Sequence, residues 1–143
     1  MLFTATVTVA AGKTEANASD TILKIAHGII RWVSIDFPPG CEGLAHSAVY
    51  HHEHRIFPST ESMSINGDRF PVEWVEYYEV YQPPYELKLR CWNLDDTYEH
   101  KITARVAILP RKAVLGTSWT DSIRDVIGAW AGALNPTGGG GVG

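Results

Sequence analysis

The sequence predicts an all-β protein: an antiparallel β-sandwich or jelly roll of about seven or eight strands, with one C-terminal amphipathic α-helix. Short segments in which apolar and polar residues alternate recur along residues 1–110, and this period of two is typical of half-buried strands. Clusters of Pro, Gly and Asn separate the segments, and no strand–helix–strand alternation interrupts them. Only residues 118–134 show a helical period.

The strands follow from the alternation in chain order. In the first, Phe3, Ala5, Val7 and Val9 alternate with threonines. The run Pro38-Pro39-Gly40 ends a later strand, because proline fixes its own φ and has no N–H to donate. The further segments with strand-like alternation or β-rich composition are residues 21–26, 28–37, 44–52, 54–57, 72–80, 85–92 and 101–108.

The predicted helix spans residues 118–134; Thr117 or Ser118 can act as its N-cap, and Asn135-Pro136 ends it. Its apolar residues form a stripe about 100° wide, enough to contact a core or a partner chain. We predict that this stripe binds a partner through Trp119, Ile123, Val126, Ile127, Trp130 and Leu134. The predicted organisation is a β-sandwich domain at 1–110, a linker and helix at 111–134, and a flexible glycine-rich tail at 135–143.

Composition excludes several classes of function. The chain has 143 residues, 20% of them charged, and a net charge of −4, which argues against a dedicated nucleic-acid binder. The longest apolar run is too short for a membrane span, and the N-terminus reads as a strand instead of a signal peptide. Cys41 and Cys91 are too few for a disulfide framework, although one bridge between them is possible.

Two polar clusters could carry chemistry. If residues 46–54 stay extended, His46, His52 and His54 share one face and could bind a transition metal, but the spacing matches no zinc signature. Asp95 and Asp96 could offer oxygen ligands to calcium, or they could form a turn with their own backbone. In both cases we prefer the interpretation without a metal: the histidines are hydrogen-bonded and solvated at a strand end, and the aspartates form a turn. We therefore expect no enzyme, no metal and no cofactor.

Aromatic side chains are dense between residues 74 and 98, where some would fill the core and others would remain exposed. A protein interface is favoured over sugar stacking, and Trp74, Tyr77 and Tyr78 are the predicted partner-binding residues of this region.

Three segments resemble small virion proteins of tailed phages: TATVTVAAGKTEAN at 4–17, HGIIRWVSIDFPPGCEGLAH at 27–46, and PPYELKLRCWNLDDTYEHKITARVAILP at 83–110. The resemblance is one of pattern over roughly residues 4–110 and leaves out the predicted helix. It implies a β-sandwich that coats or joins capsid or tail subunits, usually as a symmetric oligomer, and supplies no catalytic residues. The expected function is therefore a non-enzymatic virion structural protein, assembled in the host cytoplasm, whose partners are copies of itself and the major capsid or tail protein. The alternative is a carbohydrate- or receptor-binding β-module.

Overall fold

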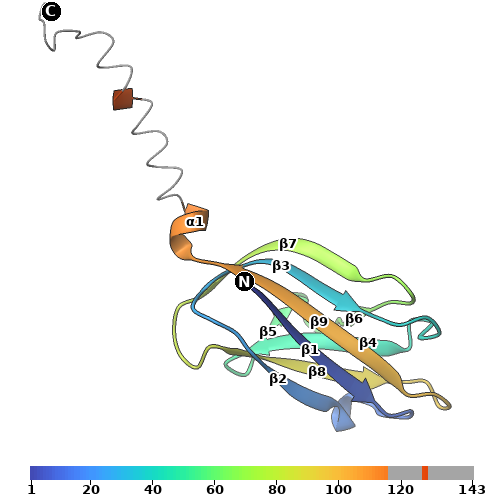
Figure 1. Ribbon diagram of the computed structural model, residues 1–143. Coiled ribbons are helices and arrows are strands. Elements are labelled where there is room, and N and C mark those ends of the chain that lie inside the picture. Colours follow the sequence, from blue (N-terminus) through green and yellow to red (C-terminus); the bar gives the residue numbers. More distant parts are fainter. Residues whose placement is uncertain (116–126, 129–143) are drawn as a thin grey trace, which may run out of the picture. The chain divides into compact units, whose positions relative to one another are not determined.

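The computed structural model describes residues 1–115 and 127–128 and confirms the predicted β-sandwich (Figure 1). Two antiparallel sheets pack face to face within the unit Met1–Ile108. In the second unit, Leu109–Gly143, the described residues include the short helix α1 (Arg111–Leu115). Of the predicted partner-binding stripe, only Ile127 lies among the described residues, where it is exposed; Trp119, Ile123, Val126, Trp130 and Leu134 lie outside them.

Successive strands mostly belong to different sheets. Sheet A has the order β1 (Leu2–Val9), β9 (His100–Leu109), β3 (Gly28–Asp36), β7 (Val72–Val80). Sheet B has the order β2 (Ser19–Lys24), β8 (Glu86–Asn93), β4 (Ala45–His51), β5 (His54–Phe57), and β6 (Ile65–Asn66) also pairs with β4. A short 3₁₀ helix, η1 (Glu15–Asn17), lies between β1 and β2.

Strand pairing is nested. The innermost pair is the β4–β5 hairpin, and it is enclosed in turn by the antiparallel pairs β3–β7, β2–β8 and β1–β9. The chain therefore runs out and back as one long antiparallel ribbon that folds into two layers. The pairing of β9 with β3 completes sheet A, and the pairing of β8 with β4 completes sheet B.

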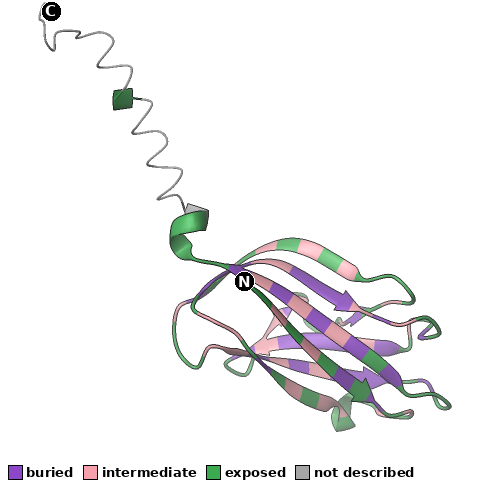
Figure 2. Ribbon diagram, viewed as in Figure 1, coloured by how far each residue is buried: buried purple, intermediate pink, exposed green. Residues whose placement is uncertain are grey.

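The core lies between the inner faces of the two sheets, because alternate residues of each strand point inward. In Figure 2 this appears as alternating bands, mostly of buried and intermediate residues along β9 and of intermediate and exposed residues along β7. The largest fully buried side chains are Phe37, Ile29, Ile30, Ile35, Leu87, Leu89, Ile102 and Ile108. Burying side chains of this size contributes about 2 kcal/mol each, which is the main force that holds the sheets together.

The predicted strands are present, with ends that differ by at most a few residues, whereas the extended path through residues 46–54 is wrong. His52 and Glu53 both have positive φ, at 51° and 65°, and form a two-residue turn between β4 and β5. His51 therefore lies opposite His54, so the face predicted for His46, His52 and His54 does not exist. The short strand β6 lies between the predicted strand segments 54–57 and 72–80, where the sequence predicted no strand.

Candidate protein–protein interface on strand β7

Strand β7 forms one margin of sheet A (Figure 1) and presents two different rows of side chains. Its outer row consists of exposed residues, namely Glu73, Val75, Tyr77 and Glu79, and is called the β7 surface below. Its inner row turns toward the sandwich and consists of Val72, Trp74, Glu76, Tyr78 and Val80. The predicted partner-binding residues are therefore divided: Tyr77 is on the outer row, and Trp74 and Tyr78 are on the inner one.

The β7 surface combines apolar and acidic groups. Val75 is 72% exposed and Tyr77 is 42% exposed, so both offer apolar area to a partner. The Tyr77 hydroxyl donates to Glu79 Oε1 at 3.0 Å, which restrains both side chains. The prediction from aromatic density omitted Val75. Its spacing of two residues from Tyr77 places both side chains on the same face of the strand.

The inner row fixes β7 on the sandwich. Trp74 packs edge-on against Phe57 of β5, with ring centroids 5.4 Å apart. Its indole Nε1 donates to Glu76 Oε1 at 3.1 Å, while Glu76 Oε2 accepts from the backbone N–H of Tyr77 at 2.9 Å. A carboxylate therefore occupies an inner position of this strand and is held there by two hydrogen bonds.

A polar contact joins the two sheets beneath β7. His51 Nδ1 on β4 and the Tyr78 hydroxyl on β7 are 2.8 Å apart. Burial, reinforced by the neighbouring ring of His52, lowers the pKa of His51 from its ordinary 6.5, and burial raises the pKa of Tyr78. His51 Nε2 is buried without a hydrogen-bond partner among the described residues, so a second proton on this ring would be poorly accommodated.

A small apolar cavity opens between the margins of the two sheets next to β7. Its volume is about 230 Å³, and its lining comes from β5, β6, β7 and the loop after β5: Phe57, Pro58, Ser59, Ile65, Val72, Trp74 and Glu76. The lining is mostly apolar, so the cavity can accept an apolar side chain.

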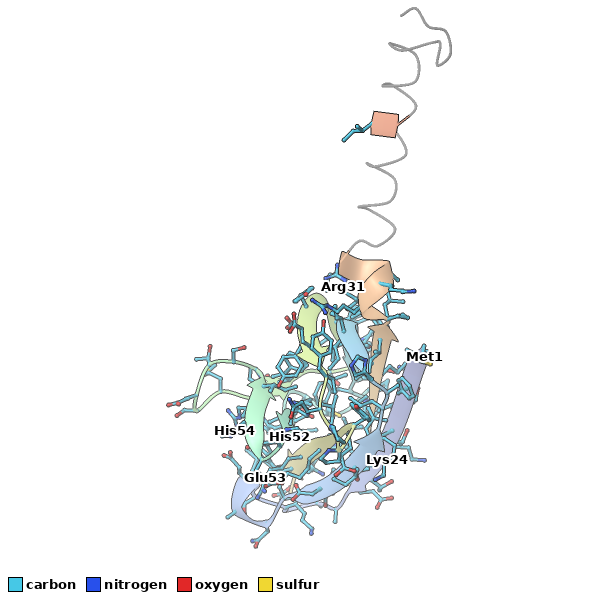
Figure 3. All side chains as sticks on the ribbon, turned by 90° about the vertical axis from the view of Figure 1, so that its left-hand side faces the viewer. Met1, Lys24, Arg31, His52, Glu53 and His54 are labelled. Atoms are coloured by element: carbon cyan, nitrogen blue, oxygen red, sulfur yellow. The ribbon has the colours of Figure 1, made fainter. Side chains whose placement is uncertain are left out.

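The four histidines do not form one cluster, because His46 lies near the start of β4, whereas His51, His52 and His54 lie at the other end of that strand and just after it. His46 bonds to the Ser64 hydroxyl at 2.8 Å and stacks on Trp92, and burial lowers its pKa. Figure 3 shows His52, Glu53 and His54 together at the β4–β5 turn, where Glu53 accepts from Lys88 Nζ at 2.8 Å. Across residues 1–115 and 127–128, no three His, Cys, Asp or Glu side chains are placed to hold a metal ion.

Asp95 forms the turn that was preferred over a calcium site. Its Oδ1 accepts from the backbone N–H groups of Thr97 and Tyr98 at 2.9 and 3.2 Å, and its Oδ2 lies 2.9 Å from His100 Nε2. These hydrogen bonds, led by the one from Thr97, lower the pKa of Asp95. The carboxylate thus has its acceptor positions occupied by its own loop.

Cys41 and Cys91 are buried and free, so no bridge joins them. Burial raises the pKa of Cys41 to about 11 and that of Cys91 to about 12, which keeps both thiols protonated at neutral pH. They act here as small apolar core residues, and Cys91 Sγ also contacts Ser47 Oγ at 3.6 Å.

Comparison with family models, curated proteins and solved structures found no match to this chain. No helix in the part of the chain that the structure describes has the length and apolar character needed to cross a membrane.

Proposed function

We propose that this chain is a non-enzymatic structural subunit of a phage-like particle, which decorates or cements capsid or tail subunits after assembly in the host cytoplasm. We further infer that its sandwich is a jelly roll. The observation that carries both statements is the nested pairing β4–β5, β3–β7, β2–β8 and β1–β9 together with the orders β1-β9-β3-β7 and β2-β8-β4-β5. A doubled-over ribbon of this kind is the jelly-roll arrangement, which is frequent in viral capsid domains and also occurs in lectins and cupins.

Since architecture alone does not determine function, the proposal also depends on the β7 surface. Val75 and Tyr77 provide an apolar centre, and Glu73 and Glu79 flank it with negative charge. This arrangement suits a protein partner that presents apolar side chains within a basic rim.

The carbohydrate-binding alternative has less support. Sugar stacking needs flat, exposed rings, but Trp74 and Tyr78 pack against the core and Trp92 is buried. Tyr98 is 67% exposed, yet the neighbouring Asp95 is engaged by its own loop. A glycan array, with and without calcium, on which the purified chain binds a defined sugar would reverse this ranking.

The direct test is co-sedimentation with particles. Cells carrying the gene are lysed, particles are purified on a density gradient, and the chain is quantified against the major capsid protein by mass spectrometry. We expect a fixed stoichiometric ratio in the particle band. A chain that remains entirely at the top of the gradient would show that it is not a virion component.

Surface variants identify the contact. V75K/Y77K should reduce particle occupancy at least about tenfold, because two charges would enter an apolar contact. I22K is the matched control, since Ile22 is also an exposed apolar strand residue but lies on β2 of the other sheet. I123K tests, in the same assay, whether the stripe of the predicted helix contributes. Equal occupancy for V75K/Y77K and wild type would exclude the β7 surface as the contact.

A further inference from the structure

Strand β1 forms the other margin of sheet A, and its pairing with β9 has no irregularity from Leu2↔Ala107 to Val9↔His100. Just before the strand, Met1 and Ile108 exchange both backbone hydrogen bonds, each 2.8 Å long. Antiparallel pairs alternate between bonded and non-bonded, so the odd residues of β1 bond to β9. The even residues turn their backbone N–H and C=O groups away from β9; they are Leu2, Thr4, Thr6 and Thr8.

These outward groups are unpaired in the part of the chain that the structure describes. Within the described residues, no other backbone group bonds to them, and the side chains of all four even residues are exposed. The strand LFTATVTV also lacks the usual protective features of a sheet edge, because it has no charge, no proline and no shift in register. Its threonines favour extended backbone and tolerate a neighbouring strand.

The other sheet margins in the described part of the chain are protected. On β7, Glu76 lies on the inner row and the register with β3 is irregular opposite it. Strand β2 carries Asp20 and Lys24, which pair with Arg90 at 3.5 Å and Glu86 at 2.7 Å on β8. Strand β5 is only four residues long and includes Arg55. Natural sheets use such charges, bulges and short strands to prevent edge pairing.

We propose that two copies of this chain pair through β1, antiparallel and across a two-fold axis, so that their A sheets become one continuous sheet. If Ala5 lies opposite Ala5 of the second copy, Thr4 lies opposite Thr6 and Leu2 opposite Thr8. Every outward N–H and C=O group of the four even residues then finds a partner, which gives about eight hydrogen bonds. No other register of the two strands uses all four residues.

A second copy fits this edge by charge and by shape. The uncharged β1 can meet itself without repulsion, whereas two β7 strands would place glutamates opposite glutamates. The inner row of β1 also gains, because Phe3 and Ala5 are only partly buried in one chain and would be covered by the same row of the second copy. An isologous contact of this kind closes as a dimer.

This proposal names the strand through which the self-association in the proposed function would occur. It rests on the proposed function only in taking a second copy of the chain as the partner. Sedimentation velocity of the full chain should give twice the 15.8 kDa mass of one chain. A monomer that still bound particles would overturn the β1 contact alone. A dimer that remained absent from particles would overturn the particle function alone.

Charge variants test the strand. T4K/T6K and T4E/T6E each place like charges opposite each other, so each should weaken dimerisation by about 30-fold. An equal mixture of the two variants should recover the dimer, because lysine then meets glutamate. Circular dichroism checks that each variant keeps the sandwich, and V75K on β7 is the control that should leave the dimer unchanged. Dimers that ignore the β1 charges, or a mixture that stays monomeric, would overturn the proposal.

The register has its own test. T4K/T6E changes the same two positions, but in the proposed register the lysine of each copy lies opposite the glutamate of the other. This variant should therefore remain dimeric where T4K/T6K does not. If both variants dissociate alike, the proposed register is wrong.

A measurement on the unmodified chain avoids any question of folding. Hydrogen exchange of the amides of Leu2, Thr4, Thr6 and Thr8 should slow by at least about tenfold as the concentration rises through the dimer transition. Exchange that stays fast at every concentration contradicts pairing at this edge.

Discussion

Strands β1 and β7 are the two margins of one sheet, yet they expose opposite kinds of surface. The margin at β7 carries charge, with Glu76 on its inner row and glutamates on its outer row. The margin at β1 carries none and leaves the backbone groups of its even residues open. A sheet that protects one edge and not the other has one edge at which strand addition is disfavoured and one at which it is allowed.

The difference also separates two kinds of recognition. On β7 a partner would meet side chains, chiefly Val75 and Tyr77, and specificity would come from shape and charge. On β1 a partner would meet backbone, and affinity would come from hydrogen bonds of an added strand. The two surfaces lie at opposite margins of sheet A, so both could be used at once.

The largest difference in stability between the two margins should appear when one inward-facing side chain of each strand is truncated to alanine. Trp74→Ala removes an indole that packs on Phe57 and lines the cavity, and it should lower the free energy of unfolding by about 3 kcal/mol. Phe3→Ala on β1 should cost about half as much, because Phe3 is only partly buried and lies at an open margin. Urea denaturation of both variants measures the difference, and equal losses would remove this distinction between the margins.

Removing the inner carboxylate should make β7 resemble β1. Glu76→Val eliminates the charge that disfavours strand addition, so we expect association to begin at about tenfold lower protein concentration than for the wild type. Glu79→Val removes an outer glutamate and keeps Glu76, so it serves as the control. Static light scattering follows both, and an unchanged onset for Glu76→Val would show that Glu76 does not protect the edge.

Acid should lower the free energy of unfolding through His51, which lies beneath β7. The folded chain disfavours protonated His51, whose pKa is lowered by burial and by His52, while the unfolded chain protonates near 6.5. As the pH falls below 6.5, the unfolded state takes up protons first, so the free energy of unfolding decreases. His51→Gln should flatten this dependence between about pH 7.5 and 5, whereas His54→Gln at the exposed start of β5 is the control. A slope that His51→Gln leaves unchanged would contradict this assignment.

The smallest effect is expected on the outer face beside β1. The hydroxyl oxygens of Thr6 and Thr103 lie 3.0 Å apart in an exposed position. Thr103→Val should therefore change the free energy of unfolding by less than about 0.5 kcal/mol, since water replaces the lost contact. A larger loss by thermal denaturation would show that this ladder contact is not interchangeable with solvent.

Alternation made the strands predictable, because inward and outward residues repeat every two positions along β1, β7 and β9. It also placed Val75 and Tyr77 on one face of β7. The turn between β4 and β5 was not predictable from composition, since His52-Glu53 lacks the Asn, Asp and Gly that are typical of a two-residue hairpin turn with positive φ. Their conformation is imposed by the pairing of His51 with His54 across the hairpin.

Only part of the candidate interface could be predicted from the sequence. Nothing local indicates that Glu76 bonds to Trp74 on the inner side of a strand, because an isolated glutamate normally predicts a solvated face. The inward direction of Trp74 depends on Phe57, which comes from the other sheet. Such cross-sheet partners follow from topology, and topology is set by contacts far apart in the chain.

The nested ribbon has a consequence for how the chain folds. The β4–β5 hairpin closes a loop of two residues, whereas the contact of Met1 with Ile108 spans 107 positions. Loop-closure entropy rises with that separation, so we expect the ribbon to form from its hairpin outward and β1 to dock last. On the ribosome the order of appearance is the reverse. Strand β1, the first of the sandwich to be synthesised, therefore waits for β9, the last of the sandwich to be made, before it can pair.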